Sequence, residues 1–204
     1  MTGEAVKPRV WVVRGGSDGG YEEPALASGH ALLGWANVGS LGGATTAAAV
    51  RELIEAAMPG EPAARISNYL GQLHAFRNAM RVGDLVVMPR KQAGQVAVGR
   101  ITGDYQAPGP VFGDAPVGGH ARPVAWLRPD GAREGLADDL LAALSSRKTV
   151  AEIKAVDALD RLLAFAQDGQ DPTLAPVTVG PASADGAAPV AAAAVADLDQ
   201  LARD

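Results

Sequence analysis

Cysteine is absent from this chain of 204 residues, and histidine occurs only three times. Without cysteine the chain can form no disulfide framework and no thiolate zinc site, and it has no cysteine nucleophile. The histidines, His30, His74 and His120, stand far apart, and no serine and acid lie near His74 in the pattern of a catalytic triad. We therefore expect no metal ion, no cofactor and no catalytic residue in this chain.

Long apolar runs are absent as well. No stretch of about eighteen apolar residues occurs in the sequence. The N-terminus also lacks the basic segment followed by an apolar run that marks a secretion signal. We expect a protein of the cytoplasm that has no membrane partner.

Positive charge is in the minority, with 18 Lys and Arg against 23 Asp and Glu. Residues 1–130 hold twelve Lys and Arg and eleven Asp and Glu, a net charge of +1. Residues 131–204 hold six and twelve, a net charge of −6. The acidity belongs to the C-terminal part, so the preceding part is free to present a basic face to nucleic acid.

What the sequence does contain is a succession of β-rich and helical segments. Strands are expected at residues 9–14, 30–35, 85–88, 95–102 and 122–127, with the third and fourth forming a hairpin. Helices are expected at residues 45–57 and 62–80, and again after Pro129-Asp130-Gly131, where the last one covers residues 149–165. The first strand ends in six loop residues, Gly15 to Gly20.

The C-terminal part changes in composition. Residues 167–189 are rich in Gly, Pro, Ala, Ser and Asp and have little periodicity, which is typical of a linker. Residues 190–204 contain the start of one further helix, which has no partner of its own to bury against.

Several groups of residues also follow one another in the order and spacing of a known family. They are Val10–Gly16 (VWVVRGG), Gly34-Trp35, Ser67-Asn68 with Gly71-Gln72-Leu73 and Phe76, Val82–Pro89 (VGDLVVMP), Val98–Tyr105 (VGRITGDY) and Arg122–Leu127 (RPVAWL). With these groups, about residues 8–165 of the chain resemble the N-terminal domain of Mrr-like restriction proteins.

The resemblance implies a fold and a function. The fold would be α+β, a PUA-like mixed β pseudo-barrel flanked by helices, as in EVE and YTH domains. Such domains bind nucleic acid and often take one modified base into an aromatic cage. Residues 8–165 would then form a recognition domain, with C-terminal helices, that binds double-stranded, methylated DNA in a modification-dependent restriction system.

The resemblance also suggests how the chain relates to a larger protein. In Mrr-like proteins a nuclease domain follows the linker, and residues 197–203 (DLDQLAR) resemble the start of the helix that leads into it. The chain would be a recognition module without enzymatic activity, truncated from a type IV restriction endonuclease through which it can form homo-oligomers.

Trp35 is the first candidate for the base pocket. A tryptophan at a strand end beside glycine can stack on an extruded base, although a core position under the helices is the alternative. Trp11 and Trp126 lie in the middle of expected strands, so we expect core packing for both. Met88, at the end of another expected strand, is included in the pocket.

Polar groups complete the expected pocket. Arg14 and the backbone N–H groups of Gly15, Gly16 and Ser17 can bind a phosphate or a base edge. Ser67 and Asn68 can hydrogen-bond a base, or they can cap and turn within the helix.

A group of cations is expected to contact DNA phosphates. Acidic residues are sparse between the second helix and the following hairpin, so basic side chains there can share one face and give salt-dependent affinity. The expected phosphate contacts are Arg77, Arg81, Arg90, Lys91 and Arg100.

Two other functions compete with this interpretation. Pro129-Asp130 and Glu152-Ile153-Lys154 match the literal pattern of metal-dependent nucleases, in which two acids on adjacent strands hold Mg²⁺ and the lysine lies near the attacking water. The helical periodicity expected at residues 149–165 speaks against that nuclease. The other alternative is a protein-interaction module of a defence system.

Overall fold

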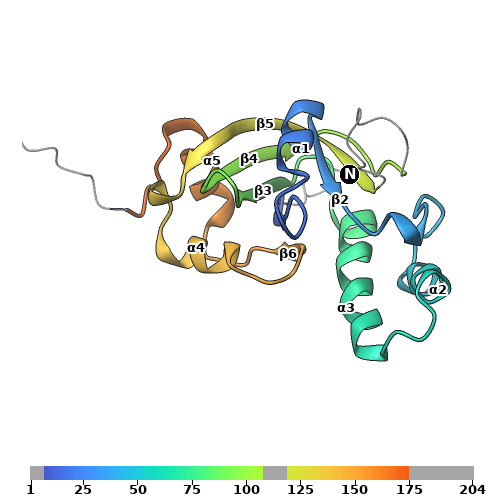
Figure 1. The fold of residues 1–204 in the computed structure, drawn as a ribbon. Helices are drawn as coiled ribbons and strands as arrows, with labels where there is room; N and C mark the ends of the chain where they lie inside the picture. The colour runs from blue at the N-terminus through green and yellow to red at the C-terminus, as the bar shows by residue number, and fades with distance from the viewer. Residues whose placement is uncertain (1–6, 108–118, 175–204) are drawn as a thin grey trace, which may run out of the picture. The chain divides into compact units, whose positions relative to one another are not determined.

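Six strands form one mixed sheet in the order β2-β5-β4-β3-β1-β6 (Figure 1). The computed structural model describes residues 7–107 and 119–174. The strands are β1 (Val10–Val13), β2 (His30–Leu33), β3 (Leu85–Arg90), β4 (Gln95–Ile101), β5 (His120–Ala132) and β6 (Val150–Glu152). β1 runs parallel to β3, and every other neighbouring pair is antiparallel.

The sheet curls into a half-barrel, and the bend lies where its longest strand, β5, pairs with β4. The pairing of β4 with β5 shifts register at Val96/Val98 and again at Val98/Gly99, and such bulges bend a strand and increase its twist. A Cβ atom on Gly99 would overlap the side chains of Val124 and Trp126, so this bend depends on glycine. Together with the helices this makes the fold α+β, as expected.

Within the described residues, five α-helices accompany the sheet. They are α1 (Glu22–Ser28), α2 (Ala47–Ala57), α3 (Ala63–His74), α4 (Asp138–Leu144) and α5 (Ala158–Asp168), and α3 continues into a π-helical turn at Ala75–Ala79. Figure 1 shows α4 and α5 together near one end of the strands and α2 beside α3 near the other. No helix within the described ranges combines the length and the apolar character needed to cross a membrane.

Alternation along β1 and β3 divides the core between the two faces of the sheet. Val10, Val12, Leu85 and Val87 pack with the apolar side chains of α4 and α5. On the other face, Trp11, Val13 and Val86 pack with Phe76 and Met80, which follow α3. Successive side chains of a strand point to opposite faces, so β1 and β3 each contribute side chains to the core on both faces of the sheet.

Asp84 joins the starts of β1 and β3. Its carboxylate, 3% exposed, accepts hydrogen bonds from the backbone N–H of Arg9 (2.9 Å) and Arg81 (3.1 Å) and from the indole N–H of Trp11 (2.8 Å). Buried charge is tolerated where hydrogen bonds satisfy it. Asp84 therefore fixes both the strand junction and the orientation of Trp11.

The expected strands and the helices at residues 45–57 and 62–80 are confirmed, with ends shifted by a few residues. The prediction of a helix over residues 149–165 is wrong in its first part, because Val150–Glu152 is a strand paired with β1 and the helix starts only at Ala158. β5 also runs through Pro129-Asp130-Gly131, where a turn was expected, and helix α1 was not foreseen.

The start of the expected linker is packed. Gln167 and Asp168 belong to the last turn of α5, and the buried Asp171 carboxylate binds the Arg161 guanidinium, which also binds Asp139. The remaining linker residues, 175–189, and the expected helix start at residues 190–204 lie outside the described residues.

Candidate functional site

A cavity of about 360 Å³ lies between α3 and β6, within the size range of ligand pockets. From α3 it is lined by Ser67, Asn68, Gly71 and Gln72, and by Ala75 just beyond the helix. These positions are spaced so that they form one stripe along the helix. From β6 and its flanks it is lined by Lys148, Val150, Ala151, Glu152 and Lys154, and the indole of Trp11 also contributes.

Gln72 ties the two walls of this cavity together. Its side chain is buried, and Oε1 accepts hydrogen bonds from the backbone N–H of Thr149 (2.7 Å) and Val150 (3.1 Å). Its Nε2 atom donates to the backbone oxygen and to Oδ1 of Asn68, both at 3.4 Å. One side chain thus holds β6 against α3 and also orients the Asn68 amide.

Trp11 lines the cavity and is fixed in place. The side chain is nearly buried, its N–H is bonded to Asp84, and the Arg9 guanidinium lies 4.8 Å from the ring centre. Glu152 is the register partner of Trp11 across the β1–β6 pair, so both side chains leave the sheet on the same face.

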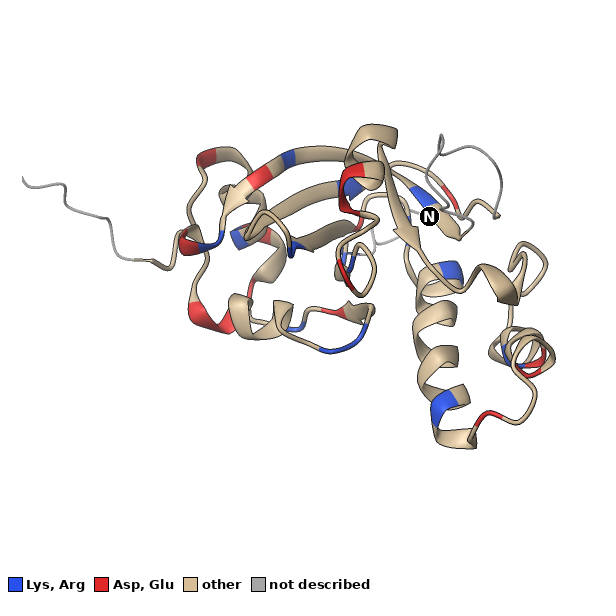
Figure 2. Ribbon diagram, viewed as in Figure 1, with Lys and Arg blue, Asp and Glu red and all other residues tan. Residues whose placement is uncertain are grey.

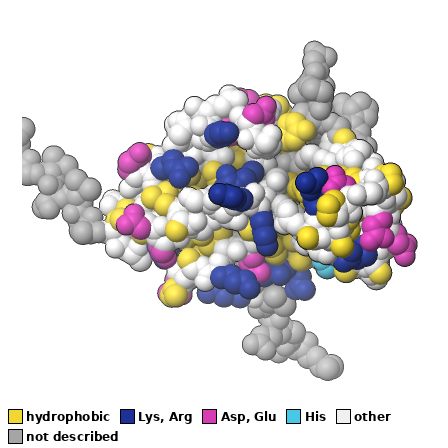
Figure 3. Space-filling view, turned by 60° about the horizontal axis from the view of Figure 1, so that its bottom comes forward, with side chains coloured by type: hydrophobic (Ala, Val, Ile, Leu, Met, Phe, Trp, Pro, Cys, Tyr) yellow, Lys and Arg dark blue, Asp and Glu magenta, His cyan; other side chains and the backbone are white. Residues whose placement is uncertain are grey.

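Cations to which the described residues give no partner flank β6 on both sides. Arg147, Lys148 and Lys154 are exposed, and the described residues offer none of these side chains a hydrogen bond or an ion pair. Figure 2 shows Lys and Arg on both sides of β6. In Figure 3, Lys and Arg side chains gather on the visible face, and most acidic side chains in that view lie nearer its edges.

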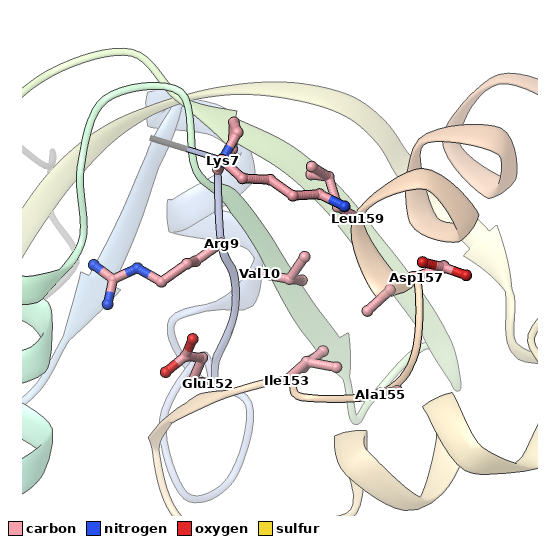
Figure 4. Close-up of a pocket in the computed structure, with 10 residues that line it drawn as sticks. Lys7, Arg9, Val10, Glu152, Ile153, Ala155, Asp157 and Leu159 are labelled. Atoms are coloured by element: carbon pink, nitrogen blue, oxygen red, sulfur yellow. The ribbon is translucent and has the colours of Figure 1, made fainter. Parts of the chain in front are cut away.

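A second, smaller cavity of about 170 Å³ lies where the segment before β1, the end of β6 and the start of α5 meet, and Glu152 lines it as well as the larger cavity (Figure 4). Arg9 and Glu152 point to one side of the β1–β6 pair in this view, whereas Val10 and Ile153 point to the other, where Leu159 lies on α5. The cavity lies beside Asp157, whose backbone is left-handed with φ of 51°. Its volume is below the range usual for ligand pockets, so the larger cavity is the better candidate.

The structure places the expected base-pocket residues in different surroundings. Ser67 and Asn68 line the larger cavity. Met88 does not reach it, because its side chain is 2% exposed and packs against α1 and β5. The Arg14 guanidinium donates to the carbonyl oxygens of Leu144, Ser146 and Lys148, so it braces the turn before β6 and does not face the cavity.

The glycine-rich loop after β1 is held in place by the β3–β4 turn. The Lys91 ammonium donates to the Ser17 carbonyl oxygen at 3.2 Å, and the Glu22 carboxylate accepts from the backbone N–H of Lys91 at 2.6 Å. Gly15 is buried, and Gly16 adopts φ of 88°, a conformation that suits glycine. The loop is therefore held by these hydrogen bonds, and its residues Gly15, Gly16 and Ser17 do not line the cavity.

Trp35 lies away from the larger cavity. It does not end a strand but begins a short 3₁₀ turn, with an unusual left-handed backbone (φ 60°, ψ 35°). Its ring meets the Tyr69 ring edge-on at 5.5 Å between centres, and Tyr69 lies off the stripe of α3 that lines the cavity. The half-buried indole packs into the α2–α3 cluster, as in the core alternative.

Most of the expected phosphate contacts are engaged within the chain. Arg77 donates to the carbonyl oxygens of Leu41 and Gly42. Arg90 binds the Glu23 carboxylate, and Arg100 donates to the Gly83 carbonyl oxygen at 3.0 Å. Of the five expected cations, only Arg81 has an exposed side chain to which the described residues give no hydrogen bond or ion pair.

His120 is a fully buried titratable group outside the cavity. Its Nδ1 atom is 2.7 Å from the Tyr105 hydroxyl, which also accepts the backbone N–H of Leu41. Nε2 makes no well-formed hydrogen bond to the described residues. Burial lowers the pKa of His120 to about 4, and the nearby main chain of Trp35 offsets this shift only in part.

The sheet order does not support the nuclease alternative. Asp130 is on β5 and Glu152 is on β6, and β4, β3 and β1 lie between these two strands. The two acids are therefore not on adjacent strands, as that chemistry requires. Nor does the described part of the chain bring three or more His, Cys, Asp or Glu together as a metal-binding group.

The sequence prediction missed the β6 wall of the cavity. Lys148, Val150, Glu152 and Lys154 are spaced by two, which is strand periodicity. That alternation was the available signal, but it is short and adjoins the stronger helical pattern of α5. Once the segment is assigned as a strand, its polar side chains lie on the same face of the sheet as Trp11.

The comparisons with known proteins add a family but no described function. A comparison with curated proteins finds no match, nor does a comparison with solved structures. One family model, described as "Domain of unknown function (DUF8426)", matches residues 11–154, a range that begins at Trp11 and ends at Lys154, both of which line the larger cavity. The chain therefore belongs to the DUF8426 family.

Proposed function

We propose that this chain is a DNA-recognition module that takes one extruded, modified base into the cavity between α3 and β6. The observation that carries the proposal is a cavity of about 360 Å³ whose lining includes Lys148 and Lys154, two cations to which the described residues give no partner. The resemblance to the N-terminal domain of Mrr-like restriction proteins, and through it to PUA-like domains, supports the same function and a role in modification-dependent restriction.

The cations account for affinity. Residues 147–154 hold Arg147, Lys148 and Lys154 against a single acid, Glu152, although the whole chain is acidic. A protein that neutralises phosphates with Lys and Arg gains affinity from counterion release, and it loses that affinity as salt rises. Because these side chains have no partner among the described residues, phosphate binding costs them no existing contact.

The cavity accounts for base recognition. An enzyme or reader that flips a base recognises it by hydrogen bonds to the base edge and by contact with aromatic or apolar side chains. Ser67, Asn68 and Glu152 offer polar groups in the cavity, while Trp11 and Ala75 offer apolar surface. Trp11 is nearly buried, so it contributes a small part of this surface.

The proposal predicts that Lys148→Ala with Lys154→Ala weakens DNA binding and flattens its salt dependence. Each lost phosphate contact should reduce the slope of log K against log[salt] by about 0.9, so two contacts should reduce it by nearly twice that amount. Fluorescence anisotropy with a labelled duplex at several salt concentrations measures the slope.

The matched control is Arg51→Ala with Arg65→Ala, which removes two charges that are paired with Glu55 and Glu61 on α2 and near α3. This variant should retain a slope close to that of the unmodified chain. Equal slopes for the unmodified chain and for the Lys148/Lys154 variant would rule out phosphate contacts at this cavity.

A further inference from the structure

Glu152 differs from the other polar residues of the larger cavity, because it is the group best placed to accept a hydrogen bond there. The Lys148 and Lys154 ammonium groups can only donate. Gln72 uses its oxygen for the backbone N–H groups of Thr149 and Val150, and Asn68 Oδ1 takes the N–H of Gln72. Among the described residues, the Asn68 amide N–H groups have no acceptor and can donate to a ligand.

The Glu152 carboxylate, by contrast, is exposed and has no hydrogen bond or ion pair to any residue that the structure describes. Its place opposite Trp11 in the β1–β6 register puts it on the face of the sheet that bears the cavity. Among the described side chains that line the cavity, Glu152 is therefore the one carboxylate, beside several donors and the Ser67 hydroxyl, which can donate or accept.

That arrangement complements one kind of base edge. The Watson–Crick edge of cytosine carries one amino donor and two acceptors, and a carboxylate is a good partner for the cytosine amino group. Thymine and uracil carry a carbonyl oxygen where cytosine carries its amino group. A carboxylate facing that oxygen gains no hydrogen bond, and the two groups repel each other.

We propose that Glu152 is the specificity-determining residue of the cavity and that it selects a cytosine-type base, by its exocyclic amino group, over the corresponding oxo base. This inference rests on the proposed function, since it concerns the same cavity. It adds which chemical group of the base is read and which side chain reads it.

Two matched pairs of probe duplexes test the inference. Duplexes of one sequence carry a single variable base opposite an abasic site, so that extrusion costs little in each duplex. The variable base is 5-methylcytosine or thymine in one pair, and cytosine or uracil in the other. Within each pair the bases differ only at the amino or oxo group and the adjoining ring nitrogen, while the methyl group is constant.

The unmodified chain should bind the amino member of each pair more tightly, by roughly fivefold to a hundredfold. In Glu152→Gln the amide can donate as well as accept, so the preference should fall to about twofold or less in both pairs. The control Glu52→Gln makes the same change on the exposed face of α2 and should keep the full preference. Thermal unfolding verifies that each variant is folded.

The outcomes separate this inference from the proposed function. If the unmodified chain binds the duplexes with salt-dependent affinity but prefers neither member of a pair, or if Glu152→Gln keeps the preference, Glu152 is not the reader. A uniform loss of affinity in folded Glu152→Gln, with the preference unchanged, would also overturn the inference. If the unmodified chain binds no duplex even at low salt, the proposed function itself fails.

Discussion

At the scale of single residues, His120 shows how burial changes chemistry without creating a binding site. Its side chain is fully buried, and its hydrogen bond to Tyr105 links the start of β5 to Leu41 in front of α2. Burial penalises the charged imidazolium and lowers the pKa of His120 to about 4, so His120 is neutral in the folded protein above that pH.

This burial predicts a loss of stability on acidification. An unfolded chain protonates His120 near pH 6.5, whereas the folded chain does not do so until about pH 4. The unfolded state therefore binds more protons between these values, and the free energy of unfolding should fall by about 1.4 kcal/mol per pH unit as pH decreases through this window. Below about pH 4 both states carry the proton and this contribution ends.

Urea unfolding at several pH values between 7 and 4 measures the effect. In His120→Gln the decrease over this window should be much smaller, although the variant is less stable at pH 7. Asp171 does not interfere: burial raises its pKa, but hydrogen bonds from Arg161 and Thr173 outweigh this and lower it, so its stabilising effect is lost as pH falls from the usual carboxyl pKa toward this lower value. An unchanged pH dependence in His120→Gln would contradict the role given to this histidine.

At the scale of elements, β6 is the segment where local pattern and tertiary structure disagree. Residues 149–165 contain apolar residues at helical spacing, yet Val150–Glu152 pairs with β1, and Arg14 donates its backbone N–H to the Thr149 oxygen at 2.9 Å. A strand of three residues has little intrinsic preference of its own, so contacts far away in the sequence decide its conformation. The Gln72 side chain is one of these contacts.

Gln72→Ala should therefore loosen β6 selectively. The variant leaves the backbone N–H groups of Thr149 and Val150 without their acceptor, and an unsatisfied buried N–H costs about 1–3 kcal/mol. Hydrogen exchange should become faster at residues 149–152, while the amides of β3 and β4 keep their protection.

The control for this experiment is Gln167→Ala, which shortens an exposed glutamine on α5. Exchange at residues 149–152 should not change in this variant. If Gln72→Ala leaves exchange at β6 unaltered, the Gln72 hydrogen bonds do not hold the two walls of the cavity together.

At the scale of the whole molecule, the sequence alone was sufficient to predict those helices and strands that a local residue pattern specifies. The hairpin of β3 and β4 and the helices α2 and α3 have clear periodicity and turn residues, and they were predicted close to their ends. Helix α1 was missed because it has only seven residues and depends on a distant contact, the Glu22 carboxylate bound to the N–H groups of Lys91 and Gln92.

The candidate site could be predicted only in part, for a related reason. Ser67 and Asn68 were singled out, and both line the cavity. Arg14, Arg77 and Arg90 had the right charge for a site, but no local pattern reveals that carbonyl oxygens and carboxylates of distant segments already bind them. Lys148 was not singled out, and Glu152 and Lys154 were considered only for a nuclease, because their place beside α3 depends on the pairing of β6.

The central claim, that DNA enters the cavity between α3 and β6, can be tested most directly by mapping the contact on the protein. A titration of the isotope-labelled chain with a duplex that carries one 5-methylcytosine, followed through backbone amide chemical shifts, gives this map. We predict the largest changes at Ser67–Ala75 and at Lys148–Lys154. Changes concentrated at the Gly15–Gly20 loop and the Lys91–Gly94 turn, with the cavity walls unaffected, would contradict the claim.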